Sequence, residues 1–154
     1  MKLMIRPDSN ANAHSLSVTD GQQCALYRVN FLLLNRKEVI QVVEMNGHVI
    51  AAITRKSGFF REEASYSLKS GDLVTIKRNV RTDLKSLTVS GCDWVVQGTE
   101  FPSDYSILGG YGRFAAVRTA PDYTEVELSL TAVAQDVLCF VLSITFLFMK
   151  QKDK

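Results

Sequence analysis

The chain has 154 residues, a length that fits one domain built around one hydrophobic core. Its composition, 46% hydrophobic and 22% charged, is typical of a globular protein and excludes a disordered chain or a disulfide-stapled miniprotein. Lys and Arg total 18 against 16 Asp and Glu, and a net charge of only +2 argues against a nucleic-acid partner. We expect a single domain over residues 1–154.

The cysteines and the N-terminus indicate a compartment. Cys24, Cys92 and Cys139 are an odd set with wide spacing, which fits neither a disulfide framework nor a zinc site. The first ten residues, MKLMIRPDSN, lack the apolar stretch of a signal peptide, because Pro7 and Asp8 interrupt them. We therefore expect a cytoplasmic protein that uses no metal and no cofactor.

Glycine-containing turn dipeptides divide most of the chain. Gly supplies the positive φ that tight hairpin turns need, and strand-like residues flank each dipeptide. The dipeptides are Asp20-Gly21, Asn46-Gly47, Ser70-Gly71, Ser90-Gly91 and Gly109-Gly110. Each is interpreted as the tip of a hairpin, so together they predict about ten strands.

The segments beside these turns are rich in Val, Ile, Tyr and Thr, which favour strands. The predicted strands include Lys2–Arg6, Gln23–Asn30, Glu38–Met45, His48–Arg55, Asp72–Arg78, Cys92–Gln97, Arg113–Arg118 and Tyr123–Ser129. In the last of them, Thr124, Val126 and Leu128 alternate with Glu125 and Glu127, the pattern of a half-buried strand. Adding Lys2–Arg6 to the hairpins brings the prediction to about twelve strands.

Residues 131–149 (TAVAQDVLCFVLSITFLFM) contain no Gly or Pro and are apolar almost all round. They predict a helix with no face for water, which must be enclosed by protein or by lipid. A helix of this length spans roughly 28 Å, close to a bilayer core of about 30 Å. Gln135 and Asp136 interrupt the segment, however, and leave 13 residues, Val137–Met149, free of strongly polar side chains. Runs of that length are more often buried core helices.

These observations favour a mainly β fold in which a closed antiparallel barrel of about twelve strands surrounds the central C-terminal hydrophobic helix. A barrel of this size should enclose a lumen near the diameter of one helix, about 10–12 Å. The alternative is a tail-anchored membrane protein in which residues 133–149 form a transmembrane helix.

Several motifs occur in a specific order along the chain. Residues 89–98 (VSGCDWVVQG) precede Asp104-Tyr105-Ser106-Ile107, and Asn46-Gly47 precedes Ala52-Ile53-Thr54-Arg55-Lys56. With the apolar C-terminal helix, these motifs resemble the LURP-one-related family of the tubby C-terminal-like superfamily, which also includes the phospholipid scramblases. The resemblance runs from about residue 27 to residue 149 and implies a twelve-stranded barrel wrapped around a C-terminal helix.

The resemblance also bears on function. Tubby domains are implicated in phosphoinositide binding and scramblases in membrane lipid traffic, although this chain shows no scramblase-like calcium loop or cysteine-rich palmitoylation run. We therefore expect a non-enzymatic binding or scaffold protein, with an anionic phospholipid headgroup as the leading ligand and a peripheral location at the membrane.

A basic connection between two predicted strands is the candidate binding site. Lys77, Arg78, Arg81 and Lys85 occur within nine residues and are opposed only by Asp83. Several Lys or Arg side chains near a membrane surface contribute about 1 kcal/mol each to binding. The alternative is a solvated loop that serves solubility.

Catalytic interpretations find little support. His14 and His48 are the only histidines, and His48 follows a turn, where an exposed side chain is expected. Gly110–Ala115 spells G-x-G-x-x-A, but strand-like residues follow where dinucleotide binding requires a helix. Glu62 and Glu63 are adjacent, so in a strand they face opposite sides and cannot form an acid–base pair.

Overall fold

The computed structural model describes residues 1–7, 15–35, 37–57, 61–79, 87–110, 112–129 and 132–148. Within these residues the chain forms a succession of β-strands followed by one helix, α1 (Ala134–Phe148). The strands are β1 (Lys2–Pro7), β2 (Ser15–Asp20), β3 (Ala25–Leu34), β4 (Lys37–Glu44), β5 (Val49–Ser57), β6 (Arg61–Ser67), β7 (Leu73–Asn79), β8 (Leu87–Ser90), β9 (Val95–Glu100), β10 (Asp104–Gly109), β11 (Gly112–Ala120) and β12 (Tyr123–Leu128).

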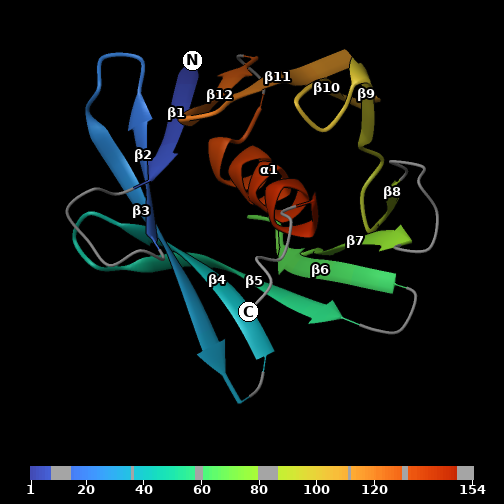
Figure 1. Cartoon of the computed structure of the whole chain (residues 1–154), viewed down its shortest axis with the longest axis horizontal. Coiled ribbons are helices and arrows are strands. Elements are labelled where there is room, and N and C mark those ends of the chain that lie inside the picture. Colours follow the sequence, from blue (N-terminus) through green and yellow to red (C-terminus); the bar gives the residue numbers. More distant parts are fainter. Residues whose placement is uncertain are drawn as a thin grey trace.

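The strands form one antiparallel sheet that curls around α1 (Figure 1). Pairing of β1 with both β2 and β12 joins the first half of the sheet to the second. In the part of the chain that is described, neighbouring strands are hydrogen-bonded all the way from β8 through β1 to β9, and the sheet is open only between β8 and β9. The prediction of a twelve-stranded barrel around a C-terminal helix is therefore confirmed, with one seam left in its wall.

The seam corrects one of the predicted hairpins. Ser90-Gly91 does form the turn between β8 and β9, but the two strands do not pair with each other. Gly91 has a φ of +96°, and a Cβ there would collide with the carbonyl oxygen of Leu73. The turn thus lies against the start of β7, and its glycine is required both for conformation and for this close approach.

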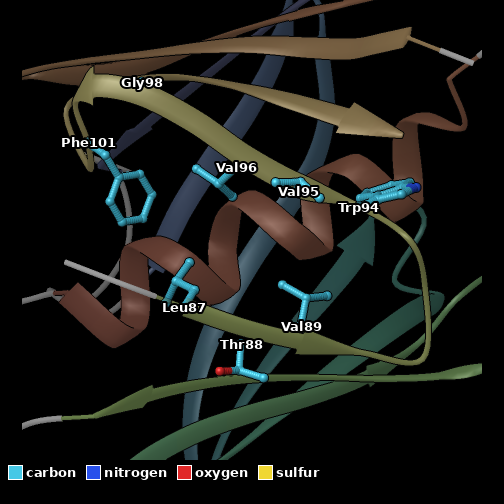
Figure 2. Close-up of a pocket in the computed structure, with 8 residues that line it drawn as sticks. All are labelled: Leu87, Thr88, Val89, Trp94, Val95, Val96, Gly98 and Phe101. Carbon is cyan, nitrogen blue, oxygen red and sulfur yellow. The ribbon is translucent and has the colours of Figure 1, made fainter. Parts of the chain in front are cut away.

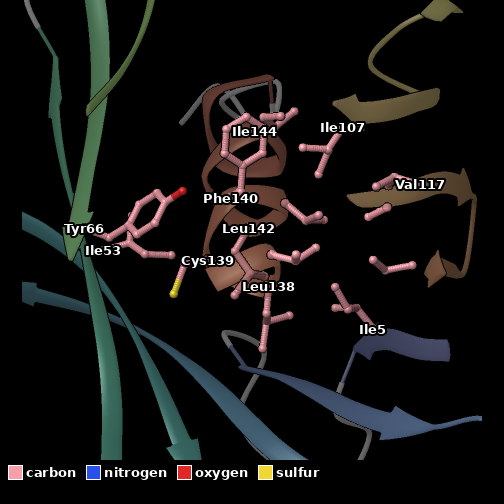
Figure 3. Close-up of a cluster of buried hydrophobic side chains, with 14 of the residues drawn as sticks. Ile5, Ile53, Tyr66, Ile107, Val117, Leu138, Cys139, Phe140, Leu142 and Ile144 are labelled. Atoms are coloured by element: carbon pink, nitrogen blue, oxygen red, sulfur yellow. The ribbon is translucent and has the colours of Figure 1, made fainter. Parts of the chain in front are cut away.

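Alternation along the strands builds the core. On β12, Thr124, Val126 and Leu128 point inward and are buried, as the period of two predicts. Equivalent inward positions on the other strands supply mainly Val, Ile and Leu to the same cluster. Figure 3 shows these side chains converging on the middle of α1 from both sides of the barrel.

The position of α1 inside the barrel explains its apolar composition. From Val137 to Leu142 every side chain is at most 2% exposed, because barrel wall surrounds this part of the helix. A helix enclosed on all sides has no need of a polar face. Its two interrupting polar residues lie in the first turn, where Asp136 accepts a hydrogen bond from the Lys69 amide (2.8 Å) and Gln135 donates to the Ile50 carbonyl (3.1 Å).

The predicted helix, residues 131–149, is thus confirmed with its ends at Ala134 and Phe148. No helix in the described ranges combines the length and the apolarity that crossing a bilayer demands. The segment that the tail-anchored alternative, residues 133–149, places in a membrane is instead buried by the barrel wall from Val137 to Leu142.

Candidate functional site

The predicted basic residues divide between the two faces of the wall. Lys77 and Arg78 are the fifth and sixth residues of β7, so they point to opposite sides of the sheet. Arg78 shares the inner face with the buried Val74 and Ile76, and Lys77 lies on the outer face. Arg81 and Lys85 fall outside the described residues, so their proximity to Lys77 stays a prediction.

Arg78 interacts with the last turn of α1. Its Nη1 donates to the Leu147 carbonyl at 2.6 Å, and its guanidinium lies 4.3 Å from the centroid of the Phe148 ring. A cation is favoured here because the carbonyls at a helix C-terminus carry partial negative charge. Its Nε is buried without a hydrogen-bond partner. Arg78 therefore closes the end of the helix, a role that its sequence neighbourhood did not indicate.

Arg55 is a second inward-facing arginine at this end of the barrel. Its Nη1 donates to Glu38 Oε2 at 2.9 Å and its Nη2 to Glu62 Oε1 at 2.7 Å. Its guanidinium lies 4.7 Å from the centroid of the Phe146 ring, and only 7% of its side chain is exposed. The guanidinium is thus held between two carboxylates and an aromatic face, which are its preferred partners.

Together these side chains form a charge ladder, defined as Glu38, Arg55, Glu62 and Arg78, on four successive strands. Glu38 lies opposite Arg55 in the β4–β5 register, and Glu62 lies opposite Arg78 in the β6–β7 register. Each member follows the inward alternation two residues from a buried Ile or Ala. That alternation is the signal that could have found the ladder in the sequence. The expected separation of Glu62 from Glu63 onto opposite faces agrees with it.

An apolar cavity lies beside the ladder, between α1 and strands β1 to β4. Its volume is about 610 Å³, within the range of ligand pockets. Phe146 of α1 stacks on Phe31 of β3 with 5.7 Å between ring centroids and forms part of its wall. The lining residues are Pro7, Ser15, Leu16, Phe31, Leu32, Leu33, Glu38, Val39, Leu142, Thr145 and Phe146.

A second pocket, of about 510 Å³, opens at the seam. Figure 2 shows that Leu87 and Val89 of β8 face Val96 and Trp94 across it, with α1 behind them. Trp94 packs on Phe140 of the helix with 5.3 Å between ring centroids, so it is an aromatic residue of the barrel wall. Mainly apolar side chains thus line the gap that the missing strand pairing leaves.

The remaining sequence candidates do not assemble into a catalytic centre. His48 is exposed in its turn, as predicted, while His14 lies outside the described residues. Most of Gly110–Ala115 belongs to β11, so no helix begins where a dinucleotide would need one. Across the described ranges no cluster of three or more His, Cys, Asp or Glu side chains is suited to hold a metal ion.

The comparisons with known proteins bear on the fold. No protein-family model matches the chain, and no curated protein matches it in sequence. Among solved structures, the chain is similar to the X-ray structure of the Arabidopsis thaliana protein AT5G01750, a protein of the LURP-one-related kind. The TM-score is 0.58 at 13% sequence identity, over 94% of this chain and 91% of that one. The likeness supports the barrel architecture that the resemblance implied, and at this identity it concerns the fold alone.

Proposed function

We propose that the protein is a non-enzymatic, tubby-like barrel of the LURP-one-related kind that binds anionic phospholipid headgroups at a membrane surface. The observation that carries this proposal is the position of Lys77. It lies on the outer face near the end of β7, and the chain then continues toward Arg81 and Lys85. Within the described residues, no ion pair joins Lys77 to an acidic side chain.

Arg78 supports the same surface in a different way. Of the two predicted residues that the structure describes, Arg78 is the one that faces inward, and its interactions hold the end of β7 against the last turn of α1. This contact fixes the strand from which the basic connection departs. Lys77, Arg81 and Lys85 are then the residues that meet the headgroup, and Arg78 is a positioning residue. Basic side chains near an anionic surface contribute about 1 kcal/mol each.

Vesicle co-sedimentation tests the proposal. The protein is mixed with vesicles of phosphatidylcholine alone or with added phosphatidylserine or phosphoinositide, at low and high salt. Binding is expected only to the anionic vesicles and should weaken as salt rises, because screening acts on exposed charges. The variant Lys77→Ala/Arg81→Ala/Lys85→Ala should bind at least tenfold more weakly. It spares Arg78, whose loss would also disturb the helix end.

The matched control removes three basic side chains that are exposed elsewhere on the molecule, as Lys56→Ala/Lys69→Ala/Arg113→Ala. Both triple variants have the same net charge, so a loss confined to the first assigns binding to the basic connection. Equal losses in the two variants would show attraction to overall charge only. Undiminished binding by the first variant would refute the assignment, and absence of binding to anionic vesicles would refute the function.

A further inference from the structure

The cavity beside the charge ladder has the features of a small-molecule site. Its walls are mostly Leu, Val and Phe side chains contributed by β2, β3, β4 and α1. Apolar walls of this kind gain from contact with an apolar body, and the volume of about 610 Å³ is large enough for an alkyl chain. The apolar wall of the cavity therefore favours a ligand with an apolar body.

The charged side chains at the rim of the cavity determine which charge they favour in the polar head of a ligand. Glu38 lines the cavity, and 46% of its side chain is exposed. Arg55 cannot attract an anion there, because both of its terminal nitrogens already donate to carboxylates. Glu38, Arg55 and Glu62 together carry a net charge of −1, from two carboxylates and one guanidinium. The local charge thus complements a cation.

The end of α1 does not add to this negative charge. Leu142, Thr145 and Phe146 bring the C-terminal half of α1 to the cavity, but Arg78 already donates to the Leu147 carbonyl at the negative pole of the helix. Arg78 is the nearest inward cation of the ladder beyond Arg55, but it lies three strands from Glu38, about 14 Å at the usual strand spacing. No ion pair joins Arg78 to Glu38 among the described residues.

We propose that this cavity binds a small amphiphile with an alkyl body and a cationic head, the head lying at the Glu38 carboxylate. The site is separate from the outer face that carries Lys77, and it favours the opposite ligand charge. The proposal therefore stands or falls independently of binding to anionic vesicles.

Calorimetric titration of the full chain tests it with three probes of equal length, each below its micelle concentration. The probes are dodecyltrimethylammonium, dodecanol and dodecanoate. The ammonium should bind tightest, and dodecanoate at least tenfold more weakly. Glu38→Gln should reduce the advantage of the ammonium over the alcohol by about threefold, as expected for one half-exposed charge contact. Glu44→Gln is the matched control, since it removes the same charge about 20 Å along the same strand.

A second pair of variants locates the binding. Thr145→Trp fills the cavity and should abolish binding of all three probes, and Leu73→Trp, at an exposed position on β7, should not. Thermal unfolding establishes that each variant is folded. If Thr145→Trp does not fold, Leu16→Trp on the opposite wall replaces it, and the comparison of Glu38→Gln with Glu44→Gln still decides the charge assignment.

Three outcomes would overturn the proposal. Dodecanoate that binds as tightly as the ammonium would refute the cationic head. A folded Thr145→Trp that keeps its affinity would refute the cavity as the location. No binding of any probe to the wild-type chain would refute both.

Discussion

The middle of the lumen and the mouth at the last turn of α1 are built from different chemistry. In the middle, Leu138, Cys139 and Phe140 are packed by apolar wall on every side (Figure 3). At the mouth the same inward positions of the strands carry Glu38, Arg55, Glu62 and Arg78. Both regions obey one rule, that alternate side chains face the helix. What changes is that the charged side chains at the mouth are paired. Arg55 is buried but donates to both Glu38 and Glu62, and such pairing lets charge replace hydrocarbon there.

The difference separates a region that specifies the fold from one that is available for binding. In the middle, the side chains form one continuous cluster of buried hydrophobic residues. The mouth combines ionised groups with a cavity of about 610 Å³. Three changes to the protein test this contrast, beginning with the one of largest effect.

Arg55→Met should be the most destabilising, by about 3–5 kcal/mol of unfolding free energy. Glu62 is only 14% exposed and would keep its charge without the partner that neutralises it. Glu38, at 46% exposed, contributes little to the loss. Denaturant unfolding measures the change, with the fold checked by circular dichroism.

A double variant and a surface pair provide the controls for that prediction. Arg55→Met/Glu62→Leu should recover most of the stability, because no unpaired charge is left buried. Lys2→Met breaks the exposed pair of Lys2 with Glu125 and should cost at most about 1 kcal/mol. A loss below that for Arg55→Met would show that the mouth is as well solvated as the outer surface.

Burial in the middle of the lumen should make the unfolding free energy depend on pH in the alkaline range. Burial, with a smaller contribution from Asp136, raises the pKa of the Cys139 thiol to about 12, from 9.0. Burial also raises the pKa of the Tyr66 and Tyr105 phenols. Between pH 9 and 12 the unfolded chain ionises at Cys139 while the folded protein does not, so the stability present below pH 9 is lost as pH rises. The expected slope is about 1.4 kcal/mol per pH unit for one group.

Cys139→Ala tests that slope. The variant lacks the buried thiol, so its unfolding free energy should fall less steeply between pH 9 and 10 than that of the wild-type chain. Cys24→Ala is the control, because that side chain is exposed in the folded protein, and it should leave the slope unchanged. Identical slopes in all three proteins would mean that Cys139 reaches solvent in the native state.

The same contrast separates what the sequence predicts from what it does not. Turn glycines, strand alternation and a helix apolar all round are local signals, and they predict the barrel and its central helix. Alternation within each strand could have placed the members of the charge ladder inward, but which carboxylate meets which guanidinium depends on the register of four strands, and single-strand patterns do not contain that information. In sequence, Arg55 and Arg78 resemble surface residues, although alternation from Ile53 and Ile76 places them inward.

The seam shows a second limit of local signals. Ser90-Gly91 has the composition of a hairpin turn, and a turn does form there. Whether the strands beside a turn pair with each other depends on what else they contact, and this turn lies against Leu73 of β7. Turn chemistry therefore predicts where the chain reverses, whereas tertiary contacts decide which strands become neighbours.

Tyr66→Phe should have the smallest effect and the opposite sign. Figure 3 shows the Tyr66 ring directed toward α1 near Cys139, and its hydroxyl is buried with no hydrogen-bond partner. An unsatisfied buried hydroxyl carries a desolvation cost, so removing it should raise the unfolding free energy by about 1 kcal/mol. Tyr66→Leu, which removes ring volume as well, should instead destabilise by about 1–3 kcal/mol. A loss of stability in Tyr66→Phe would mean that the hydroxyl is hydrogen-bonded in solution, and the middle of the lumen would then share the polar character of the mouth.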